Sequence, residues 1–329
     1  MAERVYLDHA ATSPLRPEAK AAMEEGFRLW ANPSSPHAEG RKARAALEDA
    51  RERIKAALEW DGELIFTSGA SEALWIALNR AKVSRRIISP VEHDAVFRAA
   101  PDATIFTGAE RIDADALVAI QHVNSETGTI NPVSEMAVKV RDAGALLLSD
   151  CSQSAGKMPL PDADMIVVSA HKFGGPIGTG ALLVRDFDLL EPVGGHERGY
   201  RQGTENLPGA IAMAAALEAG EWGTTSAQRT AFAEILSARR LTVGEQVDYI
   251  IALTHPTMSA QALLIRLDAM GFAVSAGSAC SSGTLKKSRV LDAFGVPDDV
   301  AARTIRVSSG WSTTPQDLER FADVWASLC

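Results

Sequence analysis

A lysine and an aspartate each follow an apolar, strand-like run in the middle of the chain. Lys172 comes after DMIVVSAH and before the glycine-rich segment FGGPIGTG, and Asp150 ends the run ALLLSD. A lysine at the carboxyl end of a strand in an open α/β sheet faces the ligand crevice, where partial desolvation lets it form a Schiff base. Pyridoxal phosphate (PLP) also needs an acid group at its pyridine nitrogen. The alternatives are a surface lysine in a flexible loop and an aspartate that caps a turn.

Two further segments have the residue types that such a cofactor needs. Residues 67–72 (TSGASE) follow a strand-like run and open a helix, where small residues and free N–H groups favour phosphate. His93 follows the run RIIS closely, where its ring is able to stack on a cofactor and move protons. Both signals are weak alone, because many strand-to-helix turns look like the first and a lone histidine is usually a polar loop residue.

One of the three cysteines has the surroundings of a nucleophile. Cys280 lies in SAGSACSSGT, among small residues that make poor core neighbours, so we expect it to be exposed and reactive. A tolerated free thiol in a loop is the alternative. Cys151, beside Asp150, is expected to be structural, and the terminal Cys329 is assigned no role. An odd, sparse set without a CxxC pair predicts neither a disulfide framework nor a bound metal.

The elements that must position these residues alternate between helix and strand over the first two thirds of the chain. The predicted strands are apolar on both faces, which favours a mainly parallel sheet covered by helices on each side and an α/β fold. Residues 38–59 have the composition of a helix, which Asp61-Gly62 ends. We predict a large domain over residues 13–208. Its strands are expected at 64–66, 86–89, 119–123, 145–149, 165–169 and 181–184.

The last third begins with alanine-rich helical segments and continues with mixed strands and helices. It predicts a smaller α+β domain over residues 209–329, joined by residues 1–12. Its last helix should begin at Thr314-Pro315, a capping residue followed by proline at the first helical position. Its other elements follow in chain order. They are helices at 209–221, 226–240 and 259–270, a strand at 272–275, the Cys280 loop, a helix near 286–294 and a strand at 304–307.

Composition and charge exclude several classes of protein. The 329 residues are 46% hydrophobic and 23% charged, as in an ordinary globular protein, and the formal net charge is −9. This acidic excess argues against a nucleic-acid or anionic-membrane binder, whose affinity depends on lysine and arginine. Neither an apolar leader at the start nor a long uncharged apolar run is present, so we expect a cytoplasmic protein in which a thiol stays reduced.

Taken together, these segments resemble the class V aminotransferase-like family of PLP enzymes and, within it, the cysteine desulfurases of the NifS/IscS-like branch. The resemblance implies the PLP-dependent transferase fold of type I. It covers nearly the whole chain in the family's order, and the long form of the cysteine loop is typical of that branch. The matching segments are YLDHAATSP, ANPSSPHAEGR, FTSGASE, EHDAV, HVNSETGTINPV, DCSQSAGK, SAHKFGGPIGTGAL, GGHERGYRQGTEN, AVSAGSACSSGT and TIRVSSG.

The resemblance implies a role for each residue of the site. Lys172 would hold PLP covalently, Asp150 would pair with its ring nitrogen, and His93 would stack over the ring. Arg306 would bind the substrate carboxylate as a fork, assisted by Asn32. The remaining cofactor contacts would come from Gln153 and Ser125 at the ring oxygen, from Ala70, Ser71, Ser169 and His171 at the phosphate, and from Thr204 across a homodimer interface.

The implied reaction converts L-cysteine to L-alanine. Lys172 would move the α-proton, and Cys280 would take the sulfur as a persulfide for an acceptor protein such as an iron–sulfur cluster scaffold. Three departures from the family's pattern bear on this expectation. Ser125 replaces the usual asparagine, Trp311 replaces a common arginine, and the connections 99–120 and 221–258 are shorter, which affects partner docking more than chemistry.

Other functions remain open at this point. A selenocysteine lyase or a β-eliminating cysteine or cystine lyase would share most of these motifs, whereas a transaminase has no need of Cys280. A catalytically silent scaffold subunit is a reading of another class, prompted by the short chain and Ser125. Against it, Lys172, Asp150, His93, Cys280 and Arg306 are all present, and function is argued from the site rather than the fold.

Overall fold

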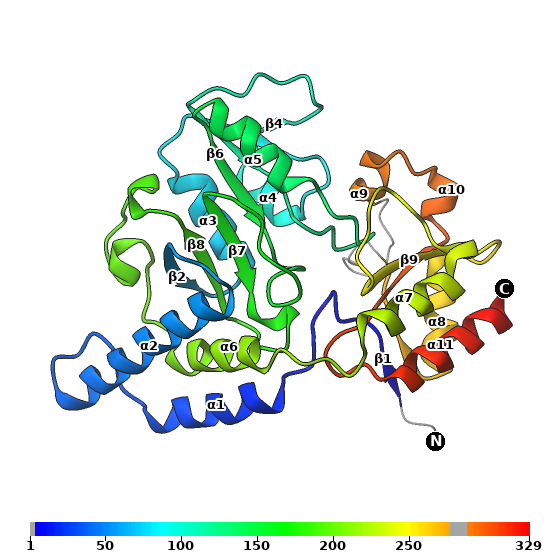
Figure 1. Ribbon diagram of the computed structural model, residues 1–329, viewed down its shortest axis with the longest axis horizontal. Helices are drawn as coiled ribbons and strands as arrows, with labels where there is room; N and C mark the ends of the chain where they lie inside the picture. Colours follow the sequence, from blue (N-terminus) through cyan, green and yellow to red (C-terminus); the bar gives the residue numbers. More distant parts are fainter. Residues whose placement is uncertain (1–3, 277–287) are drawn as a thin grey trace. The chain divides into compact units, whose positions relative to one another are not determined.

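The computed structural model describes residues 4–276 and 288–329 (Figure 1). Within the described chain the residue contacts form two compact units. The large unit consists of residues 14–122 and 132–220, and the small unit consists of residues 1–13, 123–131 and 221–329. The chain therefore leaves the large unit once, for residues 123–131, before it passes finally into the small one.

The large unit is built on a seven-stranded sheet with the strand order β2-β8-β7-β6-β5-β3-β4. The pairs from β7 to β4 are parallel, whereas β8 is antiparallel to both of its neighbours. The prediction of a mainly parallel α/β sheet is thus confirmed. The strands are β2 (Glu63–Thr67), β3 (Arg85–Ile88), β4 (Thr104–Ile105), β5 (Ala116–Ala119), β6 (Leu146–Asp150), β7 (Met165–Ser169) and β8 (Gly180–Val184).

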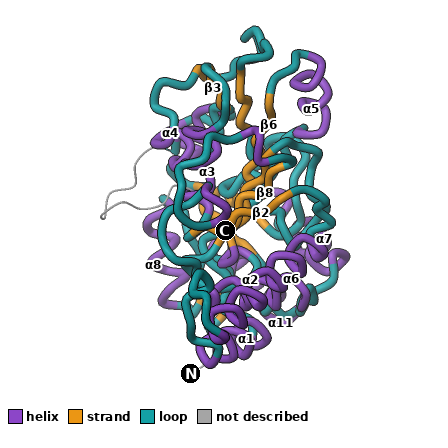
Figure 2. The backbone as a smooth tube through the Cα atoms, turned by 90° about the vertical axis from the view of Figure 1, so that its left-hand side faces the viewer, coloured by secondary structure: helices purple, strands orange, loops and turns teal. Residues whose placement is uncertain are grey.

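Helices cover both faces of this sheet, because alternate side chains of each strand enter different apolar cores. Helices α2 (Ala38–Ala57), α5 (Val133–Asp142) and α6 (Leu207–Ala219) pack on one face. Figure 2 shows α3 (Ala70–Arg80) and α4 (Asp94–Ala99), which contribute to the core on the other face. The three layers explain why the strands are apolar on both sides.

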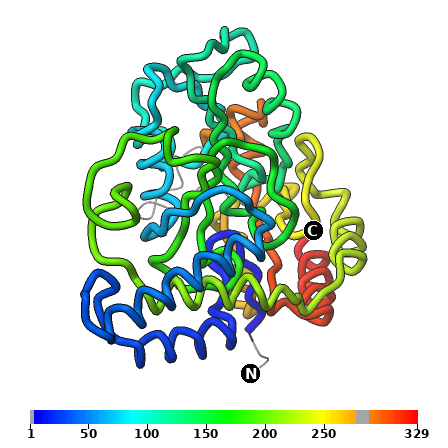
Figure 3. Tube along the Cα trace, turned by 60° about the vertical axis from the view of Figure 1, so that its left-hand side comes forward, coloured from blue at the N-terminus to red at the C-terminus, as the bar shows by residue number. Residues whose placement is uncertain are grey.

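Helix α6 lies along α2 and α1 (Pro17–Arg28), as Figure 3 shows. The α1–α6 contact depends on Gly26, because a Cβ atom there would lie 2.6 Å from Cα of Pro208. Helix α6 therefore belongs to the large unit, whereas the predicted boundary at residue 208 assigns its residues 209–219 to the small domain. A helix that is apolar on all sides is buried, which is the physical reason for this difference.

The small unit contains two short sheets and five helices among its described residues. Strand β1 (Val5–Tyr6) is parallel to β10 (Phe272–Ala273), and β9 (Ile250–Thr254) is antiparallel to β11 (Thr304–Ser308). Phe321 lies at the centre of the core, with its ring 5.7 Å from Phe272 and 6.0 Å from Phe232. The helices are α7 (Ser226–Ile235), α8 (Ala260–Ala269), α9 (Arg289–Ala293), α10 (Asp298–Ala301) and α11 (Pro315–Leu328).

Local signals predicted some element ends well and others poorly. Helix α11 begins after Thr314, whose side chain accepts a hydrogen bond from Asp317 N in a capping box, as its sequence predicts. The predicted strand 119–123 is wrong beyond residue 119. There the backbone N–H of Gln121 donates to the carboxylate of Glu92 at 2.7 Å instead of to a neighbouring strand.

The predicted helix 226–240 also ends early, at Ile235, and a separate 3₁₀ turn covers Ser237–Arg239. No described helix is both long and apolar enough to cross a membrane.

Candidate active site

Lys172 lies just beyond the carboxyl end of β7. Ser169, the last residue of that strand, is buried, and a 3₁₀ turn over Ala170–Lys172 follows it directly. Gly175 N donates to the carbonyl of Ala170 at 2.9 Å, so the glycine-rich segment folds back under the turn. A Cβ at Gly175 would lie 2.8 Å from the Ala170 side chain, so this close return depends on glycine.

Asp150 ends the neighbouring parallel strand, β6, at the same edge of the sheet. It is 8% exposed, and its Oδ1 atom accepts a hydrogen bond from Ser152 N at 2.9 Å. Because β6 and β7 are parallel neighbours, with Asp150 opposite Val167, Asp150 and Lys172 both lie at the carboxyl ends of their strands. This is the edge at which open α/β sheets bind ligands.

His93 shares an electrostatic environment with this pair. Its Nδ1 atom accepts a hydrogen bond from Ala95 N at 3.1 Å and caps helix α4, which leaves Nε2 as the protonated nitrogen of the neutral ring. His93 is exposed to solvent in part, but desolvation by the surrounding protein lowers its pKa. The charge of Lys172 lowers this pKa further, whereas Asp150 raises it. A neutral imidazole ring close to Lys172 and Asp150 is suited to stack on a cofactor that these two residues hold.

The predicted phosphate-binding turn precedes α3. Gly69, with φ +143°, has a conformation that favours glycine, and Ala70 and Ser71 form the start of the helix. A Cβ atom added at Gly69 would have no heavy atom within 4 Å, so this side of the turn is open. An open helix start in an eleven-residue helix presents N–H groups to an anion.

Basic side chains gather around Lys172, and one of them was missed by the sequence analysis. Desolvation, with the charges of Lys172 and Lys157, lowers the pKa of His171 to about 4. Desolvation and Lys172 likewise lower the pKa of Lys157 to about 7. The available signal was the lysine of QSAGK, seven residues beyond Asp150 along the chain. A cluster of basic side chains close to a carboxylate fits a group that carries both a phosphate and a ring nitrogen.

Three other predicted site residues, Gln153, Thr204 and Asn32, also lie in the large unit. Gln153 is buried in the turn after Asp150. Thr204 is exposed in the loop before α6, and Asn32 is exposed in the turn after α1, where its Oδ1 atom accepts from Ser34 N at 2.8 Å.

Arg306, in β11 of the small unit, is 6% exposed and held by three partners. Its Nη2 atom donates to the Asp8 carboxylate at 2.9 Å and to the Ser275 hydroxyl at 3.0 Å, and its Nη1 atom donates to the Ser125 carbonyl at 2.9 Å. Its buried Nε atom has no hydrogen-bond partner among the described residues. Such a donor is suited to a carboxylate ligand. Asp8 was not identified from the sequence.

Ser125 takes part in this arrangement through its backbone. The neighbouring Asn124 is buried, and its Oδ1 atom accepts from the backbone N–H groups of Glu126 and Thr127, at 2.9 and 3.0 Å. Asn124 therefore shapes the turn that presents the Ser125 carbonyl to Arg306. Glu126, whose pKa is raised by burial, accepts a hydrogen bond from Ser288 at 2.6 Å.

The cysteines differ in accessibility. Cys280 lies outside the described residues, so its predicted exposure stays a prediction. Cys151 is fully buried, and burial raises its pKa to about 12. It therefore stays a thiol at neutral pH, which agrees with the structural role expected from the sequence. Cys329 is exposed.

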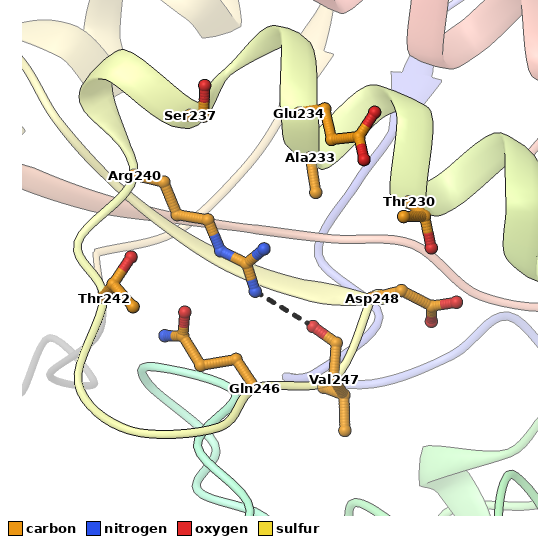
Figure 4. A pocket seen from close by; sticks show the side chains of 9 residues that line it. All are labelled: Thr230, Ala233, Glu234, Ser237, Arg240, Thr242, Gln246, Val247 and Asp248. Atoms are coloured by element: carbon orange, nitrogen blue, oxygen red, sulfur yellow. Dashed lines mark hydrogen bonds between the residues drawn. The ribbon is translucent and has the colours of Figure 1, made fainter.

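The small unit also contains a pocket of about 350 Å³ that holds none of the predicted site residues (Figure 4). Arg240 reaches across it and donates to the Val247 carbonyl at 3.2 Å. The lining contains both acidic and basic side chains, so the charge of the pocket does not indicate a class of ligand. The lining consists of Thr230, Ala233, Glu234, Ser237, Arg240, Thr242, Gln246, Val247 and Asp248.

Comparisons with known proteins agree with the geometry of the sheet edge. The family model described as aminotransferase class-V matches residues 5–115 and 110–321. A cysteine desulfurase of Cereibacter sphaeroides is 35% identical over 370 residues, covering 98% of this chain and 95% of that relative. A solved NifS-like protein has a TM-score of 0.85 at 27% identity, covering 99% of this chain and 100% of its own. A solved SspA in complex with cysteine has a TM-score of 0.79 at 27% identity, covering 94% and 100%.

Proposed function

The chain belongs to the class-V aminotransferase family, in its cysteine desulfurase branch, and from this premise we propose a PLP-dependent conversion of L-cysteine to L-alanine. The sulfur passes to Cys280 as a persulfide. The observation that carries the proposal is the placement of Lys172 and Asp150 at the carboxyl ends of two adjacent parallel strands. A covalent anchor and an acid for the ring nitrogen are the two groups that this cofactor requires.

Three further residues are proposed to contact the cofactor ring. His93 stacks on the ring, and Gln153 and Ser125 serve the ring oxygen. When bound, PLP supplies an electron sink for the bonds that break at the substrate's α- and β-carbons. The residues proposed to hold its phosphate are Ala70, Ser71, Ser169 and His171, with Thr204 from a second copy of the chain.

Lys172 and Arg306 act on the two ends of the amino acid. Lys172 takes the α-proton, a role supported by its place just beyond the carboxyl end of β7, beside the proposed cofactor site. Arg306 binds the carboxylate, with its buried Nε atom as one available donor and Asn32 assisting. The Asp8 partner fixes the guanidinium in place before the substrate arrives.

Cys280 acts as the sulfur carrier. Its thiolate attacks the substrate's sulfur, so that a sulfur–sulfur bond forms while the carbon–sulfur bond of the substrate breaks. The electron pair of the broken bond stays with the carbon, and protonation there completes alanine. The solved relative in complex with cysteine supports this choice of substrate.

The proposal includes partners of two kinds. A second copy of this chain completes the phosphate site through Thr204, which is exposed in the loop before α6. An acceptor protein, such as an iron–sulfur cluster scaffold, then takes the terminal sulfur from Cys280. The cytoplasm, where thiols stay reduced, suits both the carrier cysteine and its acceptor.

The test is the alanine and sulfide released from L-cysteine in the presence of a reductant. We expect the wild-type protein to release both in equal amounts. Cys280→Ser should lose this activity while it still binds PLP, because the anchor and the ring contacts are intact. Cys329→Ser, which removes an exposed thiol, is the matched control and should keep full activity.

The alternatives give different products. An active Cys280→Ser variant, or pyruvate in place of alanine, would support a β-eliminating lyase and contradict the carrier role of Cys280. Selenide release from selenocysteine without sulfide release from cysteine would support a selenocysteine lyase. A wild-type protein that takes up no PLP would support a silent scaffold subunit.

A further inference from the structure

A glycine-rich loop over residues 193–206 is held against the predicted phosphate-binding turn by charged side chains. The loop reads VGGHERGYRQGTEN and contains Thr204. The loop and the turn both lie within the large unit. Glu197 and Arg198 have φ values of 48° and 56°, which non-glycine residues rarely adopt. Such strain persists only where the surroundings fix the backbone.

Glu197 provides the first attachment. Its carboxylate pairs with Arg51, with Oε2 2.8 Å from Nη1 and Oε1 3.1 Å from Nη2, and both side chains are almost fully buried. The same Oε2 atom accepts from Phe66 N at 2.7 Å, on the open edge of β2. The loop is thereby fixed to the strand that leads into the phosphate-binding turn.

Arg201 provides the second attachment, inside that turn. Its Nε atom lies 3.1 and 3.2 Å from the two carboxylate oxygens of Glu72, in the first turn of α3, directly after Ser71. Glu72 in turn accepts from Ser68 N at 2.5 Å. The Nη1 atom of Arg201 donates to the carbonyl of Gly203 at 3.2 Å, one residue before Thr204.

The charge of Glu72 is the reason that this contact matters. A carboxylate one residue beyond Ser71 repels a phosphate at the same helix start. Arg201 balances that charge with a side chain that is 15% exposed, where solvent screens it only in part. Glu72 still holds the turn through Ser68, so the pair keeps the geometry of the turn without the repulsion.

We infer that Arg201 is a positioning residue that sets the affinity for the cofactor's phosphate by holding and neutralising Glu72. The inference rests on the proposed function, because it takes PLP as the ligand of the turn. It assigns Arg201 no contact with PLP itself. Two consequences follow: removal of Arg201 weakens binding through the phosphate alone, and removal of the Glu72 charge compensates for that loss.

The experiment measures binding of PLP, and of pyridoxal, which lacks the phosphate, to the apo-protein by the visible absorbance of the bound ligand. We expect Arg201→Met to weaken PLP binding roughly tenfold, the equivalent of one lost charge-assisted contact, and to leave pyridoxal binding unchanged. The double variant Arg201→Met with Glu72→Gln should recover most of the PLP affinity.

Arg198→Met is the matched control, because Arg198 lies in the same loop but pairs with Glu63 and Glu48 instead. It should bind PLP as the wild type does. If Arg201→Met does not fold, as judged by circular dichroism, Arg201→Lys replaces it. This variant keeps the positive charge that neutralises Glu72, so it should bind PLP with nearly the wild-type affinity, and a tenfold loss would contradict the neutralising role.

Three results would overturn the inference. They are equal PLP affinity in Arg201→Met and the wild type, an equal loss for PLP and pyridoxal, and a double variant no better than Arg201→Met alone. A wild-type protein that binds no PLP would instead contradict the proposed function itself. The two failures are therefore distinguishable in the same titration.

Discussion

At the residue scale, the proposed substrate-binding arginine also contributes to the structure of the small unit. Arg306 joins β11 to Asp8, which follows β1, and to Ser275, which follows β10. Its backbone pairs with Ser275 as well, at 2.6 and 3.2 Å. One guanidinium thus connects β11 to the segments of Asp8 and Ser275, so the stability of the unit and the proposed binding of substrate depend on the same side chain.

Replacement of either partner of the Arg306–Asp8 pair should therefore destabilise the protein. We expect Asp8→Asn and Arg306→Gln each to lower the free energy of unfolding by about 1–3 kcal/mol, since each leaves a partly buried charge without its partner. The double variant should cost less than the sum of the two single variants. Urea unfolding at neutral pH measures all four proteins.

The exposed pair Arg303–Asp299 is the control for this prediction. These residues are separated by one helical turn, and Asp299 is 73% exposed, so Asp299→Asn should change the free energy of unfolding by less than about 0.5 kcal/mol. If the effects of Asp8→Asn and Arg306→Gln are simply additive, the two groups do not interact in solution and the geometry of the pair is irrelevant to stability.

The same residues show how far the site was predictable. Lys172 and Asp150 follow apolar strands, so a local pattern placed both at one edge of a parallel sheet. Asp8 carries no such signal, because it lies 298 residues from Arg306 along the chain and meets it only through the fold. Lys157 is a different case. Its lowered pKa arises from desolvation, which the sequence does not show.

At the scale of elements, buried strands were predictable because both of their faces are apolar. The direction of β8 was less evident, although a signal existed. Only ten residues, 170–179, separate β7 from β8, and a parallel crossover needs a dozen or more. The antiparallel pairing of β8 follows from this short connection. By contrast, the end of β5 depends on a tertiary contact of Gln121 that no local pattern carries.

The start of α11 is an element whose local signal and observed structure agree, and it provides a test of helix stability. Thr314 accepts from Asp317 N, while the Asp317 side chain accepts from Thr314 N at 2.9 Å. Thr314→Ala removes the cap and should lower the free energy of unfolding by about 1 kcal/mol. Ser327→Ala, in the last turn of the same helix, is the control and should have little effect.

Urea unfolding of both variants, followed by far-ultraviolet circular dichroism, measures this difference. The expected loss is large enough to detect because α11 buries Leu318, Phe321 and Trp325 in the core of the small unit. Equal stability of Thr314→Ala and the wild type would mean that the helix start is held by this packing and that the capping box contributes nothing.

At the scale of the whole molecule, the division into units was only partly predictable. The change in composition near residue 208 indicated a second domain, but α6 remains with the large unit because its alanine-rich surface packs against α1 and α2. Residues 123–131 lie in the small unit although both flanking segments belong to the large one. A composition boundary cannot show such an excursion, because it depends on contacts such as that of Ser125 with Arg306.

Desolvation also shifts the pKa of basic groups in the large unit and of an acidic group in the small unit. In the large unit desolvation lowers the pKa of His93, His122, Lys157 and His171. Each of these groups binds its proton more readily in the unfolded chain. The free energy of unfolding therefore rises as the pH increases towards the pKa that the group has in the unfolded chain. In the small unit burial raises the pKa of Glu126. The protein therefore loses stability as the pH rises through the range in which Glu126 ionises.

We therefore predict that the apo large unit becomes more stable between pH 5 and pH 9. The histidines act over the lower part of this range, and Lys157, with a pKa near 7 against an ordinary value of 10.5, acts over the upper part. Hydrogen exchange of peptides from β6 and β7, corrected for the intrinsic pH dependence of exchange, measures the change. Lys157→Met should flatten the rise above pH 7 and leave the part below pH 6 intact.

Peptides that cover residues 123–131 should behave in the opposite way. Their protection should fall as Glu126 ionises, and this fall should disappear in Glu126→Gln.

PLP should reduce the pH dependence of stability in the large unit, because a bound phosphate favours the charged forms of His171 and Lys157. An unchanged slope above pH 7 in Lys157→Met would show that this lysine is as well solvated in the native protein as in the unfolded chain.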